Sequence, residues 1–193
     1  MKTTYIYYLM GKSGSGKDTL YNLIRHVMQE LKPIVMYTDR PKREGEIDGE
    51  TYHFVSTLPN HPIIEKRNYE TVSGPKWYAT LDDGQIEEGS TYIAIGTPIS
   101  YYKLTEYLTN KGSNIKVWPI LLDIDDKERL RRCYERECKE ENPDFEELIR
   151  RFLSDEDDFT NFIKSGNYHR INNDNVYKAL QEILDIIEYY TYT

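Results

Sequence analysis

Cysteine is scarce in this sequence, which contains only Cys133 and Cys138 among 193 residues. The two lie five positions apart in a charged segment, so we expect no disulfide framework and no structural zinc site, and a reducing compartment is favoured. Long apolar runs are missing too, and none is long enough to span a bilayer. The run at residues 5–10 is too short for a secretory signal. We therefore expect a soluble, cytoplasmic protein without a membrane partner.

An excess of positive charge is also missing. The chain has 25 lysines and arginines against 33 aspartates and glutamates, a net charge of −8. This balance argues against a nucleic-acid partner, although local arginines can still bind a small anionic substrate. No internal repeat or low-complexity segment is present. The length suits one domain, residues 1–193, with small inserted subdomains.

A glycine-rich stretch, Gly-Lys-Ser-Gly-Ser-Gly-Lys-Asp-Thr at residues 11–19, is the most informative feature. It follows an apolar β-favouring run and precedes apolar residues at helical spacing, an order typical of a phosphate cradle. Lys17 is expected to reach the outer phosphates, aided by the helix dipole. The alternative, a glycine-rich turn that binds nothing, does not explain why strand, loop, lysine and helix are all in register. The candidate phosphate-binding residues are Gly11, Ser13, Gly14, Ser15, Gly16, Lys17, Asp18 and Thr19.

The rest of the chain alternates between predicted strands and helices. Strands are expected at 34–38, 92–96, 117–123 and 170–172, with Pro119 indicating an edge or first position in its strand. Helices are expected after Thr97, at 126–138, from 144 with Phe145, Leu148, Ile149 and Phe152 inward, and at 175–190. This alternation predicts a three-layer α/β/α fold with a parallel core sheet. The core would comprise 1–38, 91–125 and 165–193, with a small, mostly β insertion at about 39–90 and a helical lid at about 126–164.

The segment at 38–55, Thr-Asp-Arg-Pro-Lys-Arg-Glu-Gly-Glu-Ile-Asp-Gly-Glu-Thr-Tyr-His-Phe-Val, resembles the substrate loop of guanylate kinases, which are P-loop nucleoside-monophosphate kinases. The resemblance implies that Arg40, Arg43 and Tyr52 bind the phosphate of a nucleoside monophosphate. The chemistry agrees, since two guanidiniums three residues apart can fork onto one phosphate and a phenol adds a neutral donor. The alternative is a solvated basic loop.

The resemblance continues more thinly through the insertion. Trp-Tyr-Ala-Thr at 77–80 looks like the family's Y-Y-G-S/T, which implies that Tyr78 contacts phosphate and Thr80 contacts the base. The family's guanine-reading glutamate has two candidates here. Glu65 matches the local F-I-E pattern and Glu70 matches the spacing; we favour Glu65, although either could be a surface residue.

Two later segments resemble the family's arginine-bearing lid and its adenine contact. Residues 129–136 and 146–151 are similar to R-L-x-x-R followed by E-E-x-I-x-x-R, which implies catalytic roles for Arg132, Arg136 and either Arg150 or Arg151. The alternative is an exposed helix with many ion pairs. Asn-Asn-Asp at 172–174 is similar to V-N-D-D, which places Asn173 among the ATP-binding residues.

Three departures separate this chain from the family pattern. Residues 93–96 contain no carboxylate where the family has L-D-I-D, and Met36 replaces a base-contacting serine. Asp18 stands where Ser or Thr would bind Mg²⁺, and Thr19 comes one residue later. We therefore expect Mg²⁺ to be held by phosphates and waters, with Thr19 or Asp18 behind them.

The resemblance implies an ATP-dependent phosphotransferase of nucleotide metabolism that converts GMP or dGMP to the diphosphate with ATP and Mg²⁺. The departures keep two alternatives open. One is a related kinase acting on another nucleotide or a sugar phosphate. The other is a catalytically silent binding module, although such modules tend to lack the glycine loop and lysine that are intact here.

Overall fold

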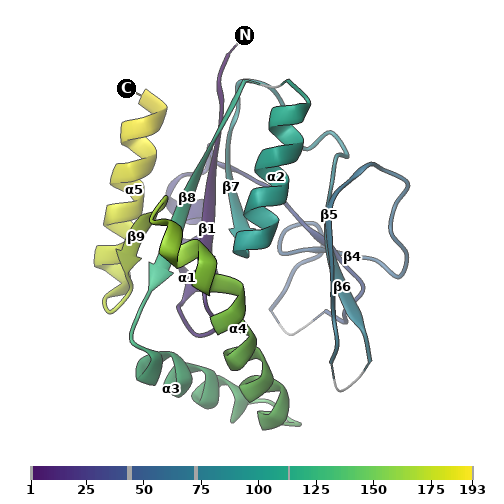
Figure 1. Ribbon diagram of the computed structural model, residues 1–193, viewed down its shortest axis with the longest axis vertical. Coiled ribbons are helices and arrows are strands. Elements are labelled where there is room, and N and C mark those ends of the chain that lie inside the picture. The colour runs from purple at the N-terminus through teal and green to yellow at the C-terminus, as the bar shows by residue number, and fades with distance from the viewer. Residues whose placement is uncertain (1, 43–44, 72–73, 113, 193) are drawn as a thin grey trace.

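The computed structural model describes residues 2–42, 45–71, 74–112 and 114–192. Its main sheet has the order β2-β7-β1-β8-β9, and all neighbouring strands are parallel. A four-stranded sheet lies beside it, and helices cover both faces of the main sheet (Figure 1). This arrangement confirms the predicted α/β fold. The strands of the main sheet are β1 (Thr4–Gly11), β2 (Lys32–Pro33), β7 (Thr91–Gly96), β8 (Ile115–Asp123) and β9 (His169–Asn172).

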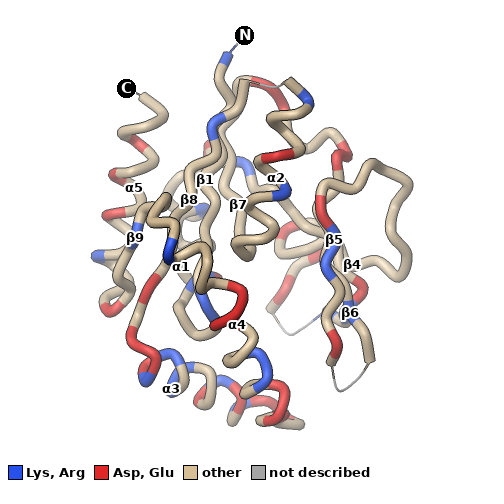
Figure 2. The backbone as a smooth tube through the Cα atoms, viewed as in Figure 1, with Lys and Arg blue, Asp and Glu red and all other residues tan. Residues whose placement is uncertain are grey.

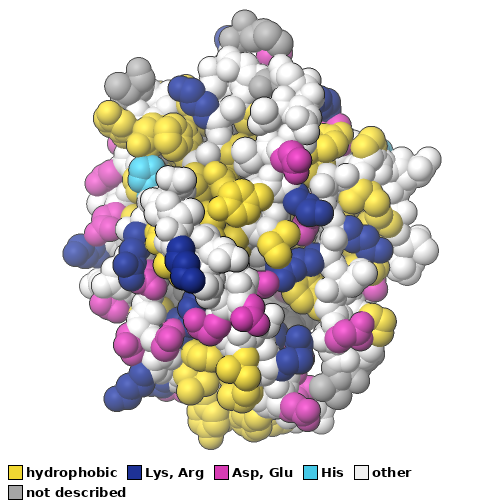
Figure 3. Space-filling view, in the orientation of Figure 1, with side chains coloured by type: hydrophobic (Ala, Val, Ile, Leu, Met, Phe, Trp, Pro, Cys, Tyr) yellow, Lys and Arg dark blue, Asp and Glu magenta, His cyan; other side chains and the backbone are white. Residues whose placement is uncertain are grey.

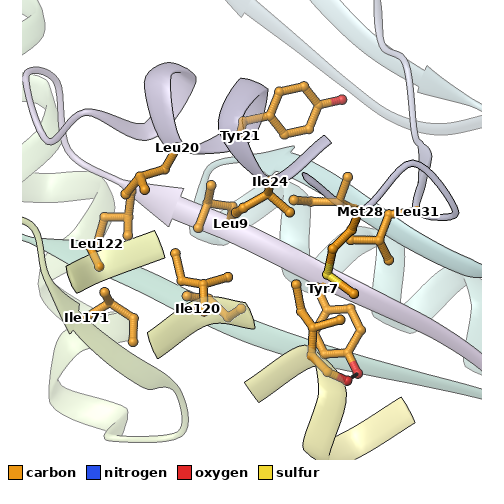
Figure 4. Close-up of a cluster of buried hydrophobic side chains, with 14 residues drawn as sticks. Tyr7, Leu9, Leu20, Tyr21, Ile24, Met28, Leu31, Ile120, Leu122 and Ile171 are labelled. Carbon is orange, nitrogen blue, oxygen red and sulfur yellow. Dashed lines mark hydrogen bonds between the residues drawn. The ribbon is translucent and has the colours of Figure 1, made fainter. Parts of the chain in front are cut away.

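Strand β1 is at the centre of the molecule and is buried on both faces. Tyr7 and Leu9 pack on one side with residues of α1 (Lys17–Val27) and α5 (Val176–Tyr192), as Figure 4 shows for Leu20 and Ile24. Ile6, Tyr8 and Met10 face the other side, toward α2 (Pro98–Asn110) and α4 (Phe145–Ser165). A parallel strand between two helical layers is expected to read as a continuous apolar run, which explains the composition of residues 5–10.

The smaller sheet has the order β4-β3-β6-β5, with β3 (Tyr37–Thr38), β4 (His53–Phe54), β5 (Ile63–Tyr69) and β6 (Lys76–Leu81). The prediction of one core strand at 34–38 was wrong. Lys32–Pro33 pairs with β7 in the main sheet, whereas Tyr37–Thr38 pairs with β4 and β6 in the small one. The chain changes sheets at 34–36, where the Ile34 amide still donates to the Ile93 carbonyl at 3.0 Å.

Strand β5 is one continuous element, which pairs antiparallel with β6 along 63–69, with an irregularity between Ile63 and Glu65. Residues 72–73 lie outside the described residues. Pro119 lies inside β8 rather than at its first position, but at this residue β8 pairs only with β1, so the proline is at a local edge of the sheet. The pairing with β9 begins only at Ile120, so the proline falls just before that ladder.

The helices begin and end at recognisable signals. Thr97 caps α2, accepting from the Ser100 amide at 3.4 Å, and Pro98 is in its first turn. Asp125 caps α3 (Asp126–Glu137), and Asp144 caps α4 by accepting from the Glu147 amide at 2.9 Å. Helix α1 ends at an exposed Val27, so the buried Met28 and Leu31 belong to the following turn rather than to the helix.

The start of α4 does not face the core as predicted. Phe145 is 41% exposed and Ile149 is 47% exposed, while only Leu148 of this turn is buried. The reason is that α4 begins beside α3, away from the sheet, and reaches the core only at Phe159 and Phe162. Hydrophobic side chains accordingly gather at the lower edge of the molecule in Figure 3. Among the described residues, no helix is both long and apolar enough to cross a membrane.

We expect Phe159→Ala to lower the free energy of unfolding by about 3–5 kcal/mol, because it empties a fully buried site. Phe145→Ala is the matched control in the same helix and should cost much less, since that ring already contacts solvent. Urea unfolding of both variants measures the difference. Equal losses would contradict the assignment of Phe145 to the surface.

Candidate active site

The phosphate loop, residues 11–19, connects β1 to α1 through two left-handed glycines. Gly14 has φ 79° and Gly16 has φ 85°, a conformation that other residues adopt at a cost. A Cβ at Gly14 would collide with the Arg129 carbonyl, and one at Gly16 would collide with the Asn173 side chain. Glycine is therefore required at both positions by conformation and by space, and the loop amides can turn toward one point at the helix N-terminus.

Side chains from distant segments hold this loop in place. Asn173 donates through Nδ2 to the Ser15 carbonyl at 2.7 Å, and the Arg129 Nε donates to the Ser13 carbonyl at 3.0 Å. The Ser13 amide in turn donates to Asp155 of α4 at 2.6 Å. The loop is thus fixed from the strand β9 side and from both helices of the predicted lid.

Arg129 is the centre of this support and had no assigned role in the sequence analysis. It is only 2% exposed, and its guanidinium pairs with Asp126 and lies 3.3 Å from Asp155 and 3.4 Å from Glu156. The ring of Phe152 lies 4.4 Å from its guanidinium carbon. The spacing of Asp126 and Arg129, one helical turn apart, was the only local signal of this arrangement.

A cavity of about 610 Å³ opens over the phosphate loop, and basic side chains in its lining outnumber acidic ones. Arg132 and Arg136 line it from one face of α3, as their spacing predicts, and Arg151 lines it from α4. Figure 2 shows basic and acidic residues interleaved along α3. Its other lining residues come from the loop and from the β9–α5 connection: Ser13, Gly14, Ser15, Gly16, Lys17, Asp18, Thr19, Asn173, Asp174 and Val176.

The placement of the two adjacent arginines on α4 separates their roles. Arg150 forms two hydrogen bonds with Glu147 at 2.7 Å on the outside of the helix and does not line the cavity. Arg151 lines the cavity, and its Nε lies 3.3 Å from Glu147. Of the two candidates, only Arg151 can face a ligand bound to the loop.

The donor set for a divalent cation at this loop is small. Asp18 and Thr19 line the cavity and are exposed to it. Over the described parts of the chain, no group of three or more His, Cys, Asp and Glu residues could hold a metal ion. These residues fit a Mg²⁺ ion that is bound chiefly through ligand phosphates and water, with Asp18 and Thr19 as its protein contacts.

The predicted acceptor loop brings Arg40, Tyr52 and Tyr78 together in the small sheet. Arg40 donates from Nε to the Tyr78 hydroxyl at 2.9 Å, and its guanidinium carbon lies 4.9 Å from the Tyr52 ring centroid. Both terminal nitrogens of Arg40 also pair with Glu46. Burial, together with Tyr78 and Asp18, raises the pKa of Tyr52. Arg43 lies outside the described residues.

The structure distinguishes the two glutamates that could read a base. Glu65 is 3% exposed and lies directly across from Thr80, itself buried, in the β5–β6 ladder. No described residue hydrogen-bonds its buried Oε1 atom. Burial raises the pKa of the Glu65 carboxyl, although Ser100 and Arg67 act in the opposite direction. Glu70 is exposed beyond the end of β5. The geometry therefore favours Glu65.

Arg67 was missed by the sequence analysis and connects three parts of the molecule. From β5 it forms two hydrogen bonds with Asp158 of α4, at 2.6 and 2.7 Å. It also donates to Thr97, the cap of α2, at 3.0 Å. Its partners lie 30 and 91 positions away in the chain, so no local pattern could have indicated them.

This fold and site define a P-loop protein, in which a glycine loop, a lysine and arginines from neighbouring helices surround an anion-binding cavity. A family model described as guanylate kinase matches residues 2–73. The guanylate kinase of Geobacter sulfurreducens is 42% identical over 60 residues, 31% of this chain and 30% of that protein. That of Caldanaerobacter subterraneus is 28% identical over 187 residues, 93% of this chain and 84% of that protein.

The first of these curated relatives are matched over about a third of their own length. A crystal structure of guanylate kinase from Anaplasma phagocytophilum superimposes with a TM-score of 0.63 and 16% identity, covering 100% of this chain and 89% of that one, which supports the fold. Taken together, these matches show that the chain is similar to guanylate kinases in sequence and in fold.

We expect Glu65→Gln to raise the Tm at pH 7 by about 2–4 °C, the shift that about 1 kcal/mol produces in a domain of this size. Because burial raises its folded-state pKa, stability falls as the pH rises from the ordinary value of 4.5 through the folded-state pKa, and it stays lower above that pKa. The gain should shrink as the pH falls through the folded-state pKa and disappear well below 4.5, where the carboxyl is protonated in both states. Glu70→Gln is the exposed control and should leave the Tm unchanged; a gain there, or none at Glu65, would contradict the buried-charge assignment.

Proposed function

We propose that this protein transfers the γ-phosphoryl group of ATP to GMP or dGMP. The observation that carries the proposal is that two groups of anion-binding side chains are assembled, Lys17 with three arginines over the phosphate loop and Arg40 with Tyr52 and Tyr78 in the small sheet. The Asp18 carboxylate contributes to the raised pKa of Tyr52, which supports a short separation between the two groups. A donor phosphate over the loop and an acceptor phosphate beside Tyr52 would therefore be neighbours, as direct transfer requires.

Each charged group has a defined role in the proposed transfer. Lys17 and the loop amides bind the outer phosphates of ATP, and Arg132, Arg136 and Arg151 balance the charge on the transferring group. Asn173 supports the loop at the end where the adenosine is expected. A bound Mg²⁺ would bridge and neutralise the phosphates. No covalent intermediate with the protein is needed.

The acceptor phosphate is expected to compete with Glu46 for Arg40. Four N–H groups of that guanidinium are engaged by Tyr78, the Pro41 carbonyl and Glu46. A guanidinium has five such groups, so an arriving phosphate must share Nη2 or displace the glutamate. Glu46 thereby keeps the arginine in position and its charge compensated before the substrate binds.

Glu65 supports the choice of guanine. A carboxylate can accept from N1–H and the 2-amino group of guanine together, whereas adenine offers no such pair. Its low exposure increases the cost of leaving it unpaired, which is the basis of discrimination between bases. The absence of a carboxylate at residues 93–96 and of a hydroxyl at Met36 predicts a narrower margin than in carboxylate-rich sites.

Those same departures favour the alternative of a kinase for another nucleotide or a sugar phosphate. The phosphate loop argues against the alternative of a catalytically silent binding module, because Gly14, Gly16 and Lys17 all line the cavity.

The test is a coupled ADP-release assay with ATP, Mg²⁺ and a panel of GMP, dGMP, AMP, CMP and UMP. We expect the guanine nucleotides to give the highest kcat/KM, and Lys17→Ala to lower kcat by at least about 100-fold because it removes charge from the outer phosphates. Circular dichroism of the variant controls for folding. Preference for another acceptor would refute the guanylate assignment, and wild-type-like turnover of Lys17→Ala would refute the loop as the ATP site.

Arg151→Ala should lower kcat roughly 10–100-fold, the effect of losing a charge-assisted hydrogen bond of about 1.5–3 kcal/mol. Arg150→Ala, one residue earlier on the outer face of α4, serves as the matched control and should change kcat less than about 3-fold. Steady-state kinetics at saturating ATP and GMP gives both values. The reverse ranking would mean that the helix presents its other arginine to the substrate.

A further inference from the structure

Helix α4 contacts the phosphate loop through two consecutive acidic residues, Asp155 and Glu156. The Asp155 Oδ2 atom accepts from the Ser13 amide at 2.6 Å. Both carboxylate oxygens of Glu156 accept from the Lys12 Nζ atom, at 2.6 and 2.7 Å. The Asp155 side chain is only 16% exposed, so its bond to the amide is charge-assisted and largely shielded from water. The middle of α4 is thereby attached to the beginning of the loop.

The same Asp155 oxygen also meets Arg129. The Arg129 Nη2 atom lies 3.3 Å from Oδ2, and its Nε donates to the Ser13 carbonyl at 3.0 Å. Ser13 is therefore held at its N–H by a carboxylate and at its C=O by a guanidinium, and these two side chains also contact each other. The N–H and C=O of one residue belong to consecutive planar peptide units, so both units are fixed. The second unit leads directly into Gly14, the first left-handed glycine of the loop.

These carboxylates lie behind the loop rather than in the cavity over it. Of the loop residues, Ser13 and Lys17 line the cavity, whereas Asp155 and Glu156 are not among its described lining residues. A phosphate bound over the loop would thus meet the backbone that Asp155 holds, and not Asp155 itself. Glu156 compensates the charge of Lys12, which leaves Lys17 as the loop lysine that faces the cavity.

We propose that Asp155 is a positioning residue for the ATP phosphates, which fixes the Ser13 peptide units so that the loop amides that follow them converge on the donor phosphates. The proposal rests on the proposed function and adds a residue of α4 to its donor site. The physical basis is conformational entropy: a loop that is already ordered loses less freedom when the phosphates bind.

Charge alone predicts the opposite effect for Asp155. A carboxylate close to an anion site repels the phosphates, so its removal would tighten ATP binding if repulsion were its only influence. Positioning predicts that its removal weakens ATP binding. The sign of the change in ATP affinity therefore distinguishes the two influences.

The experiment compares Asp155→Ala with Asp157→Ala, a matched control two residues away. Asp157 is exposed on the same helix, and both variants lose one carboxylate. The dissociation constants for ATP·Mg²⁺ and for GMP are measured separately by isothermal titration, at a temperature where both variants are folded. We expect Asp155→Ala to raise the Kd for ATP about 10-fold or more and to change the Kd for GMP less than about 2-fold. Asp157→Ala should keep both values within about 2-fold, since an exposed charge is screened.

The conservative variant Asp155→Asn tests the hydrogen bond without the charge. One oxygen of Asp155 meets both Ser13 and Arg129, and the amide oxygen of asparagine can take its place as an acceptor. We expect this variant to bind ATP within about 3-fold of the wild type. A merely structural role would lower Tm without separating ATP affinity from GMP affinity, and asparagine would not restore the first selectively.

The outcomes separate this inference from the proposed function. If the wild type binds no ATP, both fail. If it binds ATP but phosphorylates no guanine nucleotide, the proposed function fails and the ATP titrations still decide the role of Asp155. If it phosphorylates GMP and Asp155→Ala binds ATP as tightly as the wild type, or more tightly, the positioning role is refuted while the activity stands. Equal weakening by Asp157→Ala would also overturn it.

Discussion

The site depends on one buried interaction, the ion pairing of Arg129 with the carboxylates around it. This guanidinium bonds the Ser13 carbonyl of the phosphate loop and pairs with Asp155, which itself accepts from the Ser13 amide. A buried charge that loses its partners typically costs about 3–5 kcal/mol, so loop and helices keep each other in place. The loop backbone is thereby held in one conformation, so a phosphate bound to its amides would require little further ordering of the loop.

Much of the fold could be predicted because its elements carry strong local signals. The strands β1, β7 and β8 are apolar runs between turn residues, and α2 to α4 begin at polar caps that the sequence displays. What could not be predicted was the assignment of residues 32–38 to two sheets. The sheet to which each of these residues belongs depends on whether β7 or β6 supplies its hydrogen-bond partners. The apolar pattern of residues 32–38 does not distinguish between these two pairings. Likewise, the exposure of Phe145 follows from where α4 starts relative to the sheet.

The candidate site, like the fold, could be predicted only in part. The phosphate loop is contiguous in sequence, and so its residues could be named in advance. The choice between Arg150 and Arg151 required knowing which face of α4 points toward the cavity. An error of one residue in aligning the helix exchanges the two arginines. The choice between Glu65 and Glu70 required burial, which the strand pattern gives only once β5 is known to continue to Tyr69. Arg67 carries no local signal, since its role comes from contacts between separate elements.

The burial of Glu65 has an electrostatic consequence for the small sheet. A second carboxylate beside a buried glutamate would raise the electrostatic cost of the site, because like charges in a low-dielectric environment repel strongly. Residues 93–96 contain no carboxylate and so add no such repulsion. In the proposed function, Glu65 alone would then carry the charge that distinguishes one base edge from another. A side chain as fully buried as Glu65 reaches a base only if the small sheet moves relative to α2, and the Arg67 ion pairs that join β5, α2 and α4 are the contacts such a motion must rearrange.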